Sequence, residues 1–329
     1  MGKEILKRAL EYENYLVLLI IPVFLFILTN LVKGDTGYWT QFWWMFPIAV
    51  LIAIVVNTVG ISGAALFVPF FAIVFPLLAF GLTPGQSVML GLITESFGIS
   101  SSTMAFMRFG LVDTKIAFRS LTWAIPVVII SSFASFYFPE KMIYFLISIA
   151  LFLSVYSLGH SERIKAFADE LASKKSLTVT HQHKAAPENV TLTDRNGKIY
   201  NYCRCAYRIR LFGYSLGGIF QGISGFGIGE MGVVSMIVSG IPAKVGVGTN
   251  HIIVAGTAIV ASTAHLLRAS VTGSVETPWN IIAMTVPAVI IGGQIAPYVA
   301  ARLNTILLEK VLSVIFVILA IALIYIGVR

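Results

Sequence analysis

Charged residues are scarce in this chain of 329 amino acids, making up 12% of it, whereas hydrophobic residues make up 57%. Soluble domains carry about a quarter charged residues, so the composition excludes a water-soluble globule and indicates a polytopic membrane protein. The formal net charge of +8 does not indicate nucleic-acid binding, because 10 of the 23 lysines and arginines lie between residues 160 and 210. A positive loop on the cytoplasmic side of a membrane explains that cluster.

Cysteine is also scarce. The two cysteines lie in Cys203-Arg204-Cys205, and this close spacing predicts no disulfide and a reducing compartment. With His181-Gln182-His183 they offer the ligand types of a zinc site, but structural zinc sites space their cysteines by about two to four residues. We expect no metal and no cofactor, and interpret this loop as a solvated linker with a turn at residues 194–198. A zinc site remains the alternative.

Apolar runs divide the chain into four parts. Residues 1–41 hold a cytoplasmic start and a run at 15–32, which lacks the small cleavage residues of a signal peptide and therefore predicts an uncleaved first helix. Residues 42–159 and 211–329 are two further apolar regions, separated by the polar loop 160–210. Their runs lie at 42–59, 63–80, 85–107, 116–138 and 140–159, and at 211–224, 227–240, 245–267, 280–301 and 306–327.

Two identical stretches interrupt these runs, Gly60-Ile61-Ser62-Gly63 and Gly222-Ile223-Ser224-Gly225. The runs beside them include several shorter than the roughly 20 residues that a perpendicular helix needs to cross the hydrocarbon. Three more matches follow in the same order and at nearly constant separation: Pro84 with Pro242, Gly110-Leu111-Val112-Asp113 with Gly273-Ser274-Val275-Glu276, and Pro126-Val127-Val128-Ile129-Ile130 with Pro287-Ala288-Val289-Ile290-Ile291. The chain therefore contains a duplicated unit.

Each unit has five apolar segments, an odd number, so the second unit should be inverted relative to the first. With the N-terminus inside, the loop 160–210 also falls inside, which agrees with its positive charge. The predicted fold is an all-α polytopic membrane protein, an inverted repeat of two five-segment units with broken or re-entrant helices plus one extra N-terminal helix. We expect it in the cell membrane, in contact with lipid; no pattern indicates its oligomeric state.

Inverted repeats with interrupted helices are typical of secondary transporters. A break inside the bilayer is tolerated only where it is buried or lines a wet cavity. The free N–H groups that start the next half-helix, with the positive end of its dipole, attract an anion. Two such starts aimed at one point predict a binding site for a small anion.

The duplicated pattern resembles a known family. A glycine-rich break, an apolar half-helix, a proline, Gly248-Thr249-Asn250 and a glycine–hydrophobic–acidic loop are similar to the TauE/SafE sulfite exporter family, also called the toluene-sulfonate uptake permease family. The resemblance covers 42–159 and 211–327 and implies transport of sulfite, organosulfonates or related anions, usually outward. The chain departs from the family pattern at the first break, which has few glycines, and at Met231, where the first unit has Pro69.

The candidate residues follow from the breaks and from this resemblance. The expected substrate-binding residues are Gly60, Ser62, Gly63, Ala64, Thr94, Gly222, Ser224, Gly225, Phe226, Gly227, Thr249 and Asn250. The candidates for proton coupling or gating are Glu95, Glu230, His251 and Arg268, because ionisable groups inside apolar runs are costly to bury. We expect no catalytic residue.

Two alternatives remain open. The sequence also permits an anion channel. Gly-x-Ser-Gly within a membrane segment is in addition the nucleophile pattern of rhomboid-type intramembrane proteases, with His251 or His265 as the base. The symmetric duplication argues against a protease, which needs a single nucleophile and a single base.

Overall fold

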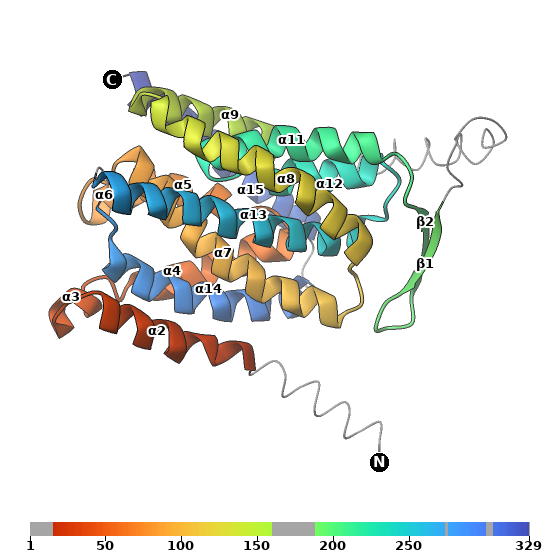
Figure 1. Cartoon of the computed structure of the whole chain (residues 1–329), viewed down its shortest axis with the longest axis horizontal. Helices are drawn as coiled ribbons and strands as arrows, with labels where there is room; N and C mark the ends of the chain where they lie inside the picture. The colour runs from red at the N-terminus through yellow and green to blue at the C-terminus, as the bar shows by residue number, and fades with distance from the viewer. Residues whose placement is uncertain (1–15, 160–187, 274–275, 301–304, 329) are drawn as a thin grey trace, which may run out of the picture.

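The computed structural model describes residues 16–159, 188–273, 276–300 and 305–328 (Figure 1). Its first half comprises α2 (Ile20–Leu31), α3 (Thr36–Thr40), α4 (Met45–Val59), α5 (Ala64–Pro69), the π turn η1 (Phe70–Val74), α6 (Phe75–Leu78), α7 (Pro84–Arg108), α8 (Thr114–Ala134), the 3-10 turn η2 (Ser135–Tyr137) and α9 (Glu140–Gly159). Strands β1 (Asn189–Thr193) and β2 (Ile199–Cys203) precede α11 (Tyr207–Ser224), α12 (Ile228–Val238), α13 (Ala243–Thr272), α14 (Trp279–Ala300) and α15 (Thr305–Val328).

Among these described residues, six helical segments are long and apolar enough to cross a membrane. The helix α7, with 25 residues, also reaches the length of a bilayer crossing, although serine, threonine and Glu95 make it more polar. The chain is therefore an all-α polytopic membrane protein, as its composition predicts.

Local signals explain where the long helices begin. Pro84 occupies the first turn of α7, and Thr83 and Gln86 form a capping box in which each side chain accepts from the other residue's backbone N–H. The carboxylate of Asp113 caps α8 by accepting from the Ile116 N–H at 3.1 Å.

The helix pairing repeats between the two halves. In chain order, α4, α7, α8 and α9 of the first half correspond to α11, α13, α14 and α15 of the second. In the first half α4 and α7 both pack against α14 of the second half. In the second half their equivalents, α11 and α13, both pack against α8 of the first half. Two further large contacts join equivalent helices, α7 with α13 and α9 with α15. This exchange of partners is what a duplicated unit predicts. The inversion of one unit relative to the membrane stays a prediction.

The segments around each break form a hairpin of two half-helices. In the first hairpin, α4 with α5–α6, the rings of Phe42 and Phe75 lie 5.4 Å apart and hold its open end together. In the second hairpin, α11 with α12, the Arg210 Nη1 donates to Ser239 Oγ at 2.9 Å at its open end. The first open end lies near α3 and the second near the β strands, at opposite ends of the molecule (Figure 1). The breaks themselves therefore lie in the interior.

The described part of the polar loop is structured, which corrects its interpretation as a solvated linker. Strands β1 and β2 pair antiparallel from Asn189–Cys203 to Thr193–Ile199. The turn at 194–198 is confirmed, since the Asp194 N–H donates to the Lys198 carbonyl at 2.9 Å and Gly197 takes a φ of +80°. The β hairpin docks on the α7–α8 loop, where the Arg195 N–H donates to the Phe109 carbonyl at 3.0 Å.

The prediction that the two cysteines form no disulfide is wrong. Cys203 and Cys205 are bonded to each other. The chain bends at Arg204 and brings their Cα atoms to 5.1 Å, within the normal range for a disulfide. The zinc alternative also involves His181 and His183, which lie outside the described residues.

Candidate functional site

The first break starts where Gly60 ends α4 in the left-handed conformation, with φ +83°. A Cβ atom there would lie 2.7 Å from a methyl carbon of Val247, so both the backbone conformation and the close approach of α13 require glycine. Ile61, Ser62 and Gly63 are buried, and the chain resumes as a helix at Ala64. The break thus lies inside the protein, as an interrupted membrane helix requires.

The second break begins at a different position of the repeated motif from the first. The first break starts at the first glycine of its motif, Gly60, whereas the second starts at the last glycine of its motif, Gly225. Gly222, Ile223 and Ser224 form the last turn of α11, and the backbone leaves the helix at Gly225, with φ +91°. Gly227, with φ +123°, precedes the start of α12. Because such conformations favour glycine, Gly225, the last residue of the repeated motif, and Gly227, which lies outside it, determine where the helix stops.

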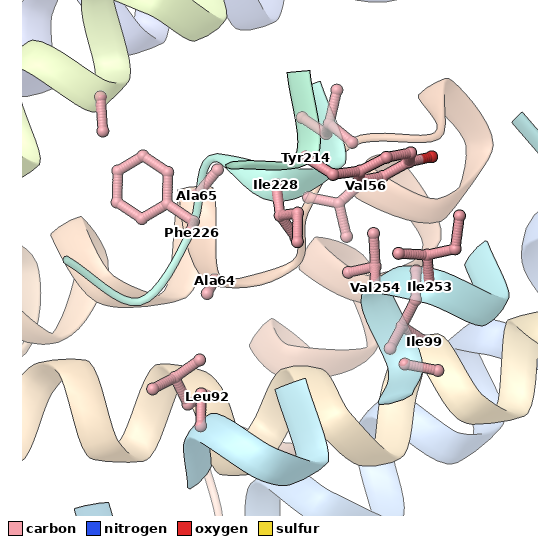
Figure 2. Close-up of a cluster of buried hydrophobic side chains, with 14 of the residues drawn as sticks. Val56, Ala64, Ala65, Leu92, Ile99, Tyr214, Phe226, Ile228, Ile253 and Val254 are labelled. Atoms are coloured by element: carbon pink, nitrogen blue, oxygen red, sulfur yellow. The ribbon is translucent and has the colours of Figure 1, made fainter. Parts of the chain in front are cut away.

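The two breaks lie against each other. A Cβ atom at Gly229, in the first turn of α12, would lie 3.0 Å from the backbone nitrogen of Ser62. A Cβ atom at Gly225 would lie 3.2 Å from Val68 in the first half-helix. Figure 2 shows Ala64 and Ala65 of the first hairpin beside Phe226 and Ile228 of the second, all within one buried cluster. The structure therefore brings the predicted residues of both breaks together.

Glu95 contacts the first break from α7. The Ser62 hydroxyl donates to Glu95 Oε1 in a short hydrogen bond. The backbone N–H groups of Gly63 and Ala64 lie close to the same carboxyl. Glu95 is 2% exposed, and its Oε2 has no hydrogen-bond partner among the described residues. An internal carboxyl thus occupies the place where the start of the first half-helix is expected to attract an anion.

A small cavity opens between Glu95 and α4. Its lining includes Asn57, Gly63, Thr94 and Glu95, and it has room for about one water molecule. The Asn57 Oδ1, like the Glu95 Oε2, is a buried acceptor without a partner in the part of the chain that the structure describes. The hydroxyl of Thr94 lies 3.2 Å from that of Thr285 on α14. A sulfite-sized anion needs more space than this cavity provides.

Glu230 is the second buried carboxyl at the breaks. It lies in the first turn of α12 and is 2% exposed. The Ser62 N–H and the Ser154 hydroxyl are nearby, but neither oxygen of Glu230 has a partner in hydrogen-bonding geometry among the described residues. The amide of Gln221, which is fully buried in the last turn of α11, is also unpaired on both its atoms. Unpaired buried polar atoms are costly, and those of Glu230 and Gln221 lie beside the second break.

Asn250 connects the parts of the second hairpin. Its Oδ1 accepts from the Tyr214 hydroxyl at 2.8 Å, and its Nδ2 donates to the Gly229 carbonyl at 2.9 Å. The neighbouring Thr249 faces the α7–α8 loop, where its Oγ1 accepts from the Asp113 N–H at 2.9 Å. Both side chains are thus engaged with protein groups that position the second hairpin and the loop.

The other predicted residues lie around this centre. Gly222 packs on α8, where a Cβ atom would lie 2.0 Å from Ser131 Oγ. The ring of His251 lies tilted against that of Phe106, with centroids 4.4 Å apart, and its Nδ1 lies 2.8 Å from the Val247 carbonyl. Arg268 lies over the ring of Phe136, 3.9 Å from its centroid, near the end of α13. The structure does not bring Thr249 or Arg268 to the meeting point of the breaks.

The serines of the two motifs have different partners. Ser62 donates to Glu95, whereas Ser224 donates to the Phe220 carbonyl at 2.7 Å within its own helix. The Nε2 of His265 lies 3.1 Å from the Gly222 carbonyl, and neither described histidine, His251 or His265, hydrogen-bonds to either serine. The described geometry thus contains no serine–histidine pair of the kind that nucleophilic catalysis uses.

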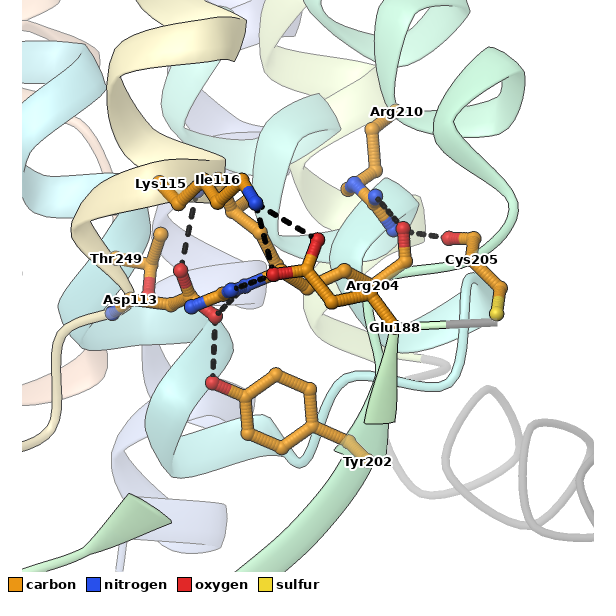
Figure 3. Close-up of polar contacts among 9 residues, drawn as sticks. All are labelled: Asp113, Lys115, Ile116, Glu188, Tyr202, Arg204, Cys205, Arg210 and Thr249. Atoms are coloured by element: carbon orange, nitrogen blue, oxygen red, sulfur yellow. Dashed lines mark hydrogen bonds and ion pairs between the residues drawn. The ribbon is translucent and has the colours of Figure 1, made fainter. Parts of the chain in front are cut away.

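A polar cluster holds the β hairpin on the helices (Figure 3). The Asp113 Oδ2 accepts from Tyr202 at 2.7 Å and from Arg204 Nε at 2.8 Å. Burial by itself raises the pKa of the Asp113 carboxyl, but the hydrogen bonds from Arg204 and Tyr202 outweigh burial and place the pKa below its ordinary value. Glu188 pairs with Lys115 at 2.8 Å and with Arg204. This cluster connects Thr249 to β2 through Asp113.

Sequence reasoning missed several residues of the site, namely Asn57, Ser154, Tyr214 and Gln221. Each is a polar side chain within an apolar run, and this is the signal by which they could have been found. The partner of Tyr214, Asn250, lies 36 positions away along the chain, and the sequence does not reveal that contact.

Comparison with known proteins agrees with the duplicated pattern. A family model described as "Sulfite exporter TauE/SafE" matches residues 45–323, which is most of the chain. The searches of curated proteins and of solved structures found no match.

Proposed function

Because the chain belongs to the sulfite exporter TauE/SafE family, we propose that it is a secondary-active transporter, and in the usual direction of that family an exporter, of small sulfur-containing anions. Sulfite and organosulfonates are the expected substrates. The proposed location is the cell membrane, with the N-terminus and the 160–210 loop on the cytoplasmic side, where the loop's positive charge fits.

One observation carries the proposal, namely the contact between the two breaks. Gly229 of the second hairpin packs against the Ser62 backbone of the first, and the hairpins open toward opposite ends of the molecule. A site where two half-helices start offers free backbone N–H groups to an anion from both sides. Discontinuous helices of this kind carry the substrate sites of many secondary transporters.

The proposed transport mechanism is alternating access. The cavity at the first break has room for about one water molecule, so an anion enters only after a hairpin moves relative to α7 and α13. Movement of the first hairpin opens the site toward α3, and movement of the second opens it toward the β strands. The close glycine contacts between the hairpins separate and re-form in each cycle.

Binding of anions to the purified protein tests this function. Titration calorimetry in detergent against sulfite, thiosulfate, taurine and sulfoacetate, with acetate as the comparison, should show saturable binding of at least one sulfur-containing anion. Counterflow in proteoliposomes should then show that the flux saturates, which distinguishes a transporter from a channel. Uniform absence of binding, or a flux that stays proportional to concentration, would contradict the proposal.

A further inference from the structure

Glu95 occupies the position of an anion at the first break. It lies near the middle of α7 and is 2% exposed, and its Oε1 accepts a hydrogen bond from the Ser62 hydroxyl. The N–H groups of Gly63 and Ala64, at the start of the helical segment Ala64–Leu78, lie close to it. A carboxylate there competes with a substrate anion for the same donors.

Among the residues that the structure describes, no lysine, arginine or histidine balances the charge of Glu95. The helix α4, the segment 60–78 and α14 carry no lysine, arginine or histidine. Arg108, at the far end of α7, donates to Gln294. On α13, His251 and His265 contact Phe106 and the Gly222 carbonyl instead.

The charged group that does act on Glu95 is another acid, Glu230. Two buried carboxylates without a cation nearby are strongly unfavourable, and a substrate anion would add a third negative charge. The anion is therefore compatible with this site only when the Glu95 carboxyl is neutral.

The unpaired atoms also favour a proton at this position. The Glu95 Oε2 and the Asn57 Oδ1 line the same cavity, and both are acceptors without a donor among the described residues. A proton on Oε2 makes Glu95 a donor, and the cavity has the size of the one water that would relay it to Asn57. Loading one proton thus satisfies both buried oxygens.

The Ser62 hydroxyl links this proton to the anion. A serine hydroxyl has one proton to donate. When Glu95 is ionised, its Oε1 takes that proton in a hydrogen bond. A proton on Oε2 makes the carboxyl neutral and Oε1 a weaker acceptor, so the Ser62 hydroxyl is released more easily to an anion at the break. Protonation therefore removes a negative charge and makes a donor available at the same place.

We propose that Glu95 is a proton-binding residue of the transport cycle and that its proton must be in place when an anion binds at the first break. The inference rests on the transport function proposed above. Proton and anion consequently bind together to the same open state of the site, and the proton enters from water on the side to which the site is open.

The second hairpin provides a matched control. Ser224 stands in the repeated position, but its hydroxyl donates to the Phe220 carbonyl, an acceptor that does not titrate. Ser224→Ala should change the affinity by the same factor at every pH. Glu95→Gln should instead abolish the dependence on pH, whereas Ser62→Ala, which keeps the titrating carboxyl, should weaken binding and retain that dependence.

Binding of thiosulfate and ethanesulfonate across a range of pH tests the inference, because both anions stay fully ionised near neutral pH. The full-length protein in detergent is titrated from about pH 6 to about pH 9. Above the pH at which Glu95 releases its proton, the affinity of the wild type should fall about tenfold per pH unit, as linkage to one proton requires. Glu95→Gln should bind with an affinity independent of pH.

A second measurement needs no variant. Calorimetry of the wild type in buffers of different ionisation enthalpy counts the protons taken up with each anion, and about one is expected at the alkaline end of the range. If sulfite alone binds, the same count is made with sulfite after correction for its own titration. Wild-type affinity that is flat over the whole range, with no proton uptake, overturns the inference but leaves the transporter proposal standing. Absence of binding of these three anions and also of taurine and sulfoacetate overturns the transporter proposal itself.

Discussion

The hydrogen bonds of Asn250 predict a measurable coupling between α13 and the second hairpin. Asn250→Ala removes the acceptor of the fully buried Tyr214 hydroxyl and the donor to the Gly229 carbonyl. An orphaned buried hydroxyl costs about 1–3 kcal/mol, and the lost bond to Gly229 costs about 0.5–1.5 kcal/mol. The expected destabilisation is therefore about 2–4 kcal/mol, or roughly 2 °C in melting temperature for each kcal/mol in a protein of this size.

A double-mutant cycle isolates the contact from the loss of volume. Tyr214→Phe alone leaves the Asn250 Oδ1 unpaired and should cost about 1–3 kcal/mol. In the Asn250→Ala background the same change removes a hydroxyl that is already orphaned, so it should cost nothing or stabilise slightly. Melting temperatures of the four proteins in detergent give the coupling. An equal cost of Tyr214→Phe in both backgrounds would refute the assigned hydrogen bond.

Three further predictions concern packing, pH and the motif serine. Gly222→Ala places a Cβ atom 2.0 Å from a side-chain oxygen and 2.6 Å from a backbone nitrogen of α8, so it should lower the melting temperature strongly. The control Gly81→Ala places a Cβ atom with no other atom within 4 Å, so it should leave the melting temperature unchanged. The pKa of Asp113 is lowered in the folded protein, so its contact with Arg204 contributes stability above the ordinary carboxyl value of about 3.9 and loses it as the pH falls through the lower folded value. The gap in melting temperature between the wild type and Asp113→Asn should therefore be present at neutral pH and close in acid; a gap that widens on acidification would contradict the assignment. Ser224→Ala should keep part of the counterflow in proteoliposomes, because its hydroxyl is engaged within its own helix, and complete loss of turnover would instead favour a nucleophilic serine.

Apolar length and periodicity predicted most helices closely. The run 85–107 corresponds to α7 at Pro84–Arg108, and the run 280–301 to α14 at Trp279–Ala300. Hydrophobic length decides where a membrane helix begins and ends, so these bounds are readable from the sequence. The β hairpin was missed because its strands have five residues each and lie in a polar, charged stretch.

The candidate site was predicted only in part, for physical reasons. The letters Gly-Ile-Ser-Gly recur in both halves, yet the second break depends on the positive φ values of Gly225 and Gly227, which a motif does not report. The pairing of Ser62 with Glu95 joins residues 33 positions apart, one in the first break and the other on α7. Such contacts form because the first hairpin packs against α7. The sequence indicates which residues are buried, but it does not indicate which buried residues contact each other.

The contact between the two breaks is the central claim, and hydrogen–deuterium exchange of the backbone amides tests it most directly. Exchange is measured on the purified protein with and without saturating thiosulfate or sulfite. If both half-helix starts donate to one anion, the amides of residues 61–66 and of residues 226–231 should slow together when the anion binds. Anion binding that slows only one of these segments, or neither of them, would contradict a single site shared by the two breaks.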